Sequence, residues 1–136
     1  MNQLPCSDDP LMVRTDFSRA ASWEGLLAAL DTPTEDGFLA HVEPLDDRRF
    51  AGVTREEAIA LLPDAYEHPL LVLADATALG STDLPLLVID LVEERGRAIR
   101  VVAAELWGIE NNLSLSNMYF EEFAGAVDED GVYRGL

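Results

Sequence analysis

The stretch Leu70-Leu71-Val72-Leu73-Ala74 is followed along the chain by a second apolar run, Leu86-Leu87-Val88-Ile89-Asp90-Leu91-Val92. Continuous apolar runs of this length are typical of strands that are covered on both faces. Residues 97–103 then alternate polar and apolar side chains, after a turn at 93–96. The second run and residues 97–103 therefore predict a β-hairpin whose second strand has one solvated face. We expect the two runs to be the central strands of a sheet.

The residues before these runs predict strands and helices in alternation. Residues 11–15 read as a first short strand. In the helix predicted next, apolar residues recur at i, i+3, i+4 and i+7, which is the spacing of a face laid on a sheet. Asp16 or Ser18 is the expected N-cap of this helix, and Asp31-Thr32-Pro33 ends it. The apolar residues of that face are Trp23, Leu26, Leu27 and Leu30.

Two further strands and a second helix are expected between this helix and the first apolar run. Residues 38–43 read as a strand, and residues 48–52 as a further short strand. Thr54 and Glu57 have the spacing of a capping box, which predicts a helix through Leu62 that Pro63 ends. Residues 75–84 read as an irregular connection between the two central strands.

The C-terminal region predicts one more helix and a small edge strand. Phe120, Phe123, Ala124 and Val127 would form the buried stripe of the helix, and Ser114, Ser116 or Asn117 would cap it. Residues 132–134 would add the edge strand. The fold class is therefore α/β: a single domain over residues 11–136, with a mixed, mostly parallel sheet, covering helices and a β-hairpin in the C-terminal half. Residues 1–10 are expected to be a flexible N-terminal segment.

Composition favours a cytoplasmic protein. The chain has 136 residues, 49% of them apolar and 26% charged, which suits one globular domain with a core of its own. Cys6 is the single cysteine, so an internal disulfide is excluded and a reducing compartment is expected. The first ten residues lack the pattern of a signal peptide, and no apolar run approaches the roughly 18 residues that span a bilayer. We therefore expect no association with a membrane.

The net charge is −17, and all nine basic residues are arginine. A field this negative repels nucleic-acid phosphates and anionic membranes, and it attracts basic partners. The alternative interpretation is that acidity only keeps a small protein soluble. Without lysine, Walker-type phosphate binding and Schiff-base chemistry are excluded, and no glycine-rich phosphate loop occurs. No cofactor is predicted.

Strand-end carboxylates are the candidates for metal or acid–base chemistry. Asp16 follows the first predicted strand and Asp75 follows the first apolar run. If the two strands are parallel neighbours, these carboxylates would meet at one sheet edge and share a Mg²⁺ ion or a proton. Aspartate after a strand is also a routine turn former or helix cap. His41 and Glu43, two apart on a predicted strand, would form a weaker metal site, and a solvated strand face is the alternative there.

Residues 107–123 mix bulky apolar side chains with amides and carboxylates more densely than any other stretch. In a structural interpretation, Trp107 and Ile109 fill the core while the asparagines bond to the backbone in a turn-and-cap arrangement. In a functional interpretation, the same segment is a recognition surface, because interfaces favour aromatic anchors with polar neighbours. Catalysis by Glu110 is a third interpretation. The candidate binding residues are Trp107, Glu110, Asn111, Asn112, Asn117 and Tyr119.

The run W-G-I-E-N-N-L-S-L-S-N-M-Y-F-E-E-F (107–123), followed by D-E-D-G-V-Y-R-G (128–135), resembles a family of small, acidic bacterial proteins described as a domain of unknown function. The resemblance extends to P-L-L-V-I-D-L (85–91) and M-V-R-T-D-F-S (12–18), and so spans most of the chain. It implies no activity, cofactor or catalytic residue.

Three functions are open at this point. The first is a non-catalytic, acidic protein-binding module, such as an inhibitor or immunity-type protein that captures a basic partner. The second is a small enzyme that uses Asp16, Asp75 or Glu110 with a divalent cation. The third is a self-assembling structural component, because a short edge strand such as residues 132–134 favours pairing between copies.

Overall fold

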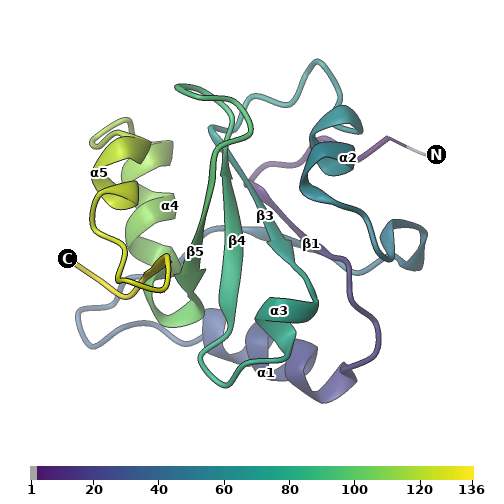
Figure 1. Cartoon of the computed structure of the whole chain (residues 1–136), viewed down its shortest axis with the longest axis horizontal. Coiled ribbons are helices and arrows are strands. Elements are labelled where there is room, and N and C mark those ends of the chain that lie inside the picture. The colour runs from purple at the N-terminus through teal and green to yellow at the C-terminus, as the bar shows by residue number, and fades with distance from the viewer. Residues whose placement is uncertain (1–2) are drawn as a thin grey trace.

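Six strands form one sheet in the order β2-β1-β3-β4-β5-β6 in the computed structural model, which describes residues 3–136. Helices flank this sheet, and α4 and α5 lie on the opposite side of it from α2 (Figure 1). The strands are β1 (Leu11–Arg14), β2 (Glu43–Leu45), β3 (Leu70–Ala74), β4 (Pro85–Asp90), β5 (Ala98–Val102) and β6 (Val132–Tyr133). The helices are α1 (Ala20–Leu30), α2 (Arg55–Ala60), α3 (Ala76–Leu79), α4 (Leu106–Ser114) and α5 (Phe120–Ala124), with 3₁₀ turns η1 (Arg48–Phe50) and η2 (Ala103–Glu105).

The strand pairing confirms the predicted fold class. β1 pairs in parallel with both β2 and β3, and β5 pairs in parallel with β6. β3, β4 and β5 are joined by antiparallel pairing, so the predicted hairpin is the β4–β5 unit. The chain is a single α/β domain with a mixed, mostly parallel sheet.

Side chains of the central strands alternate between two hydrophobic clusters, one on each face of the sheet. In β3, Leu70 and Val72 belong to the cluster that includes α1, α4 and α5, whereas Leu71 and Leu73 belong to the cluster that includes α2. This two-sided burial explains the continuous apolar runs, because neither face of these strands meets solvent. Leu4 is buried in the second cluster, and its N–H donates to the Leu61 carbonyl. The flexibility expected for residues 1–10 stays a prediction.

The strands expected at residues 38–43 and 48–52 are wrong, because side chains take over the backbone hydrogen bonds there. The Thr34 hydroxyl accepts the N–H of Phe38, and the Glu110 carboxylate accepts the N–H of His41. Only Glu43 of the first segment enters a strand, β2. In the second, the Asp47 carboxylate accepts the N–H of Arg49 and starts the η1 turn. Such local side-chain bonds compete with sheet pairing.

The predicted helices form, but several of their predicted ends are wrong. α1 has no side-chain cap: the Asp16 carboxylate closes a turn with the N–H and hydroxyl of Ser18 instead. Thr54 and Glu57 do form a capping box on α2. α5 begins after Tyr119, whose N–H donates to the Glu122 carboxylate, so none of the three predicted caps serves it.

Two segments expected to be irregular are helical. Residues 75–84 contain α3, which the Asp75 carboxylate caps by accepting the N–H of Ala78. Residues 106–114 form α4 in place of the expected turn, because Leu106, Ile109 and Leu113 recur at helical spacing and are buried on the sheet. Among residues 3–136, no helix is long and apolar enough to cross a membrane.

Tyr66 ties the loop before β3 to the start of β1. Its hydroxyl accepts a hydrogen bond from the N–H of Leu11 at 3.0 Å and donates one to the Leu70 carbonyl at 2.8 Å. Burial, which disfavours the tyrosinate, raises the pKa of Tyr66 to about 12 from its ordinary value of 10.0.

We expect this tyrosine to make the fold sensitive to alkali. Because the pKa of Tyr66 is higher in the folded chain, the unfolded chain releases the proton first as the pH rises. The stabilisation is complete below pH 10 and falls by about 1.4 kcal/mol per pH unit until about pH 12, roughly 2.7 kcal/mol in all. Denaturant unfolding at several pH values measures this slope. Tyr66→Phe should remove the part of this pH dependence that comes from Tyr66. The raised pKa of Tyr133 affects the slope equally in both proteins. Equal slopes in the two proteins would contradict the prediction.

Candidate functional site

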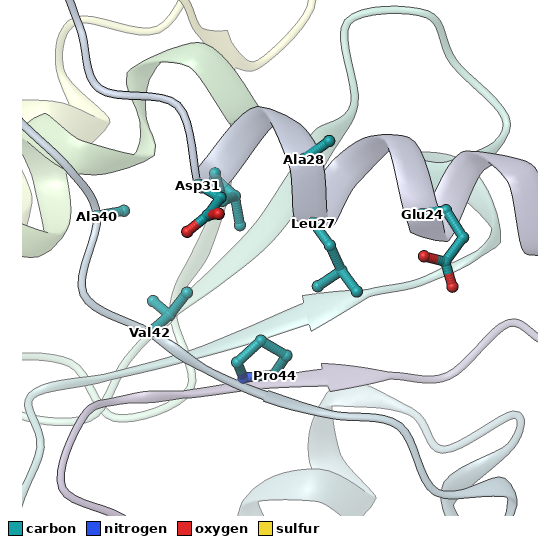
Figure 2. Close-up of a pocket in the computed structure, with 8 residues that line it drawn as sticks. Glu24, Leu27, Ala28, Asp31, Ala40, Val42 and Pro44 are labelled. Carbon is teal, nitrogen blue, oxygen red and sulfur yellow. The ribbon is translucent and has the colours of Figure 1, made fainter.

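A groove runs along α1 beside the edge of the sheet, between the helix and the segment that leads into β2. Trp23 and Leu26 are the buried residues of this helix and pack on the core. One wall of the groove comes from the neighbouring helical stripe, and the other from residues 40–44, which lead into β2 (Figure 2). The volume of this hollow is about 470 Å³. Its lining consists of Glu24, Leu27, Ala28, Leu30, Asp31, Ala40, Val42 and Pro44.

The groove continues into a second hollow of about 360 Å³, which shares Leu30 and Ala40 with the first. Phe38 and Trp107 line this part, and their rings stack with centroids 4.9 Å apart and an interplanar angle of 13°. Phe38 keeps 46% of its surface exposed, so the stacked pair presents an apolar surface to solvent. We call the two hollows together the α1 groove.

The α1 groove lies in a strongly acidic part of the chain. Residues 20–47 contain seven carboxylates and no arginine. Two of these carboxylates are neutralised by arginines from elsewhere, Asp46 by Arg14 and Asp47 by Arg49. The other five, which form no ion pair within the described residues, are Glu24, Asp31, Glu35, Asp36 and Glu43. The groove therefore combines an apolar lining with carboxylates that lack a positive partner.

Helix α4 holds the outer wall of the groove in place. The carboxylate of Glu110 is only 2% exposed and accepts the N–H of His41 at 2.6 Å. The same carboxylate accepts hydrogen bonds from the Asn111 amide at 3.0 Å and from the Ser114 hydroxyl at 2.6 Å. Asn111 also donates to the Leu39 carbonyl at 2.9 Å. These bonds fix a segment without regular structure, which otherwise has few backbone partners.

The fold brings both histidines of the chain to one hollow of about 330 Å³ beside Glu110. His41 and His68 line it with Asp8 and Asp9, and a ring nitrogen of His68 bonds to the Ser7 carbonyl at 2.7 Å. The pairing of His41 with Glu43 on one strand face is wrong, because β2 begins only at Glu43. No three Asp, Glu, His or Cys side chains among residues 3–136 come together as a set of metal ligands.

Asp16 and Asp75 do follow neighbouring parallel strands and line one hollow at the sheet edge. Both oxygens of Asp75, however, bind the guanidinium of Arg100, at 2.7 and 2.8 Å. Glu110 lies at a different hollow, so the three carboxylates do not converge. Each accepts hydrogen bonds from the protein, as expected for turn and cap residues, but Oδ2 of Asp16 is buried and has no hydrogen-bond partner among the described residues.

The six candidate binding residues do not form one site. Trp107 lines the α1 groove, and Glu110 and Asn111 hold its wall. The Asn112 amide donates to the Gly108 carbonyl one turn earlier in α4. Asn117 and Tyr119 are exposed in the turn after α4, and Tyr119, 69% exposed, borders a separate small hollow. Sequence reasoning assigned Leu27 and Leu30 to the face of α1 that lies on the sheet. It did not predict that they line a groove together with Glu24, Ala28 and Asp31.

The fold and the groove define the structural class of this protein. It is a single-domain α/β protein with an apolar groove that lies among carboxylates without ion-pair partners within the described residues. A family model described as "Domain of unknown function (DUF6924)" matches residues 9–136, and the chain belongs to this family. The resemblance noted in the sequence is thereby confirmed. A search of curated proteins found no match.

Proposed function

We propose that this chain is a non-catalytic, acidic binding module that captures a basic protein partner in the α1 groove, in the manner of an inhibitor or immunity-type protein. The observation that carries the proposal is the coincidence of exposed apolar surface with unpaired carboxylates in one concave region. An apolar centre supplies affinity by burial, and surrounding charge supplies orientation and a fast association rate. The net charge of −17 strengthens the attraction of a basic partner.

The two other functions have less support. For a metal-dependent enzyme, Asp16 and Asp75 lie at one edge, but the bidentate contact with Arg100 already neutralises Asp75. A second copy of a chain with charge −17 is repelled over distances up to the Debye length, about 8 Å at physiological salt. The groove therefore suits a partner of opposite charge better than a metal ion or another copy.

Charge reversal at the groove tests the proposal. Glu24→Arg with Asp31→Arg changes the net charge from −17 to −13, because each reversal adds two charges. Both residues are exposed and form no ion pair in the described part of the chain, so the fold should persist. Affinity capture from native lysate at low salt should enrich a basic protein with the unaltered chain, and the double variant should bind that protein at least about tenfold more weakly.

The matched control is Glu67→Arg with Glu129→Arg, which makes the same change in net charge at two exposed carboxylates outside the groove. We expect this control to weaken binding by no more than about twofold, through the long-range field alone. Equal losses in the two double variants would show that the overall charge, and not the groove, captures the partner. Far-ultraviolet circular dichroism checks that both variants are folded.

A further inference from the structure

We propose that the partner segment bound in the α1 groove is an amphipathic α-helix, with a basic residue at each end of its apolar stripe. This inference rests on the proposed function and names the kind of partner surface that the groove fits. Three features of the groove point to it: the closed edge of β2, the residue pattern of α1, and the apolar opposite wall.

The sheet edge that borders the groove is closed to an added strand. β2 has only three residues, and the N–H of Glu43 points inward to the Pro10 carbonyl beside β1. Successive N–H groups of a strand point to opposite edges, so Pro44 is the residue of β2 whose N–H would point to the free edge. Proline has no N–H. A docking strand would therefore find no backbone donor within β2. Short strands and proline are common means of blocking edge pairing.

The stripe of α1 in the groove has the pattern of a helix-packing surface. Glu24, Leu27, Ala28 and Asp31 lie at i, i+3, i+4 and i+7 and therefore share one face of the helix. With a rise of 1.5 Å per residue, the two carboxylates are roughly 10 Å apart along the axis. Between them lie a leucine and a small alanine, and Ala28 leaves room for the ridge of a second helix.

A partner helix with basic and apolar residues at matching positions would form ion pairs and apolar contacts with the groove at the same time. Basic residues at i and i+7 match the spacing of Glu24 and Asp31, because both helices have the same rise per residue. Apolar residues at i+3 and i+4 would then meet Leu27 and Ala28. Val42 and Pro44 supply the apolar wall opposite them, as Figure 2 shows. Helix-in-groove recognition uses anchors at this spacing.

Two synthetic peptides of identical composition test the inference. Each has about 14 residues, half leucine and half arginine, with capped ends; one has leucine at helical spacing and the other at alternate positions. Calorimetric titration at low salt should show the first peptide binding at least tenfold more tightly than the second. The bound peptide should also gain helical circular dichroism. Comparable or tighter binding of the alternating peptide would overturn the helix inference while leaving the proposed function standing.

Variants locate the binding surface. Ala28→Phe adds bulk at an exposed position in the groove and should weaken the helical peptide about tenfold without changing the charge. Ala21→Phe, at an exposed position of α1 that does not line the groove, should leave binding unchanged. Binding that resists Ala28→Phe would overturn the assignment to this groove. Failure of both peptides to bind the unaltered chain would overturn the proposed function as well.

Discussion

Trp23→Ala is expected to lower the free energy of unfolding by about 3 to 5 kcal/mol, the largest effect of any single substitution considered for this chain. Trp23 is 1% exposed and packs between α1 and the sheet in the larger hydrophobic cluster. Truncation removes the transfer free energy of the indole and leaves a cavity that α1 closes only in part. Since a domain of this size is stabilised by 5 to 15 kcal/mol in total, much of the stability would be lost.

Denaturant unfolding followed by circular dichroism measures this loss. Trp23→Phe serves as the matched control, because it keeps an aromatic ring in the same space and should cost about 1 to 2 kcal/mol. A loss below about 1 kcal/mol in the alanine variant would contradict the packing of α1 on the sheet. It would also remove the support for the α1 groove, whose stripe is positioned by this contact.

The second large effect is expected at Glu110. Glu110→Ala removes the acceptor of three hydrogen bonds, from the His41 N–H, the Asn111 amide and the Ser114 hydroxyl. Bonds to a charged acceptor contribute about 1.5 to 3 kcal/mol each, but partial hydration of the freed donors offsets part of this. We expect a loss of about 3 kcal/mol in unfolding free energy. Hydrogen exchange should show faster exchange at the amide of His41, in the groove wall.

Glu110→Gln should be far milder, with a change within about 1 kcal/mol. The glutamine carbonyl can accept the two N–H bonds, and its amide can donate to the Ser114 hydroxyl, which rotates to accept. No ion pair joins Glu110 within the described residues, so loss of its charge also relieves a desolvation cost. A glutamine variant as unstable as the alanine variant would show that charge, and not hydrogen bonding, holds the wall.

Asp90 provides an informative contrast, because all of its partners are donors. Its carboxylate is 2% exposed and accepts the N–H groups of Val92, Glu93 and Glu94 in the turn of the β4–β5 hairpin. An asparagine would place an amide donor against a backbone donor. Amide substitution should therefore destabilise the chain at Asp90 and be tolerated at Glu110, although both carboxylates are equally buried.

The regions that sequence reasoning located correctly are those in which local pattern and burial agree. Residues 70–74 and residues 86–90 of the second apolar run are strands because both faces are covered, and the spacing of Trp23 and Leu26 places α1 on the sheet. Leu91 and Val92, at the end of that run, lie outside β4, and Val92 is exposed. The wrong predictions lie where side chains, and not a neighbouring strand, accept the backbone N–H groups. Thr34 and Glu110 hold residues 38–42 out of a strand, and Asp47 turns residues 48–50 into η1.

The sequence by itself determined the fold class, the central strands, the main helices and the acidic character of the chain, because each depends on composition or on spacing within one element. Only the tertiary structure decided where a site lies. Phe38 meets Trp107, and His41 meets Glu110 across 69 positions, once α4 packs beside the loop after α1. Periodicity is a property of neighbours along the chain, whereas a groove is formed by segments that only folding brings together.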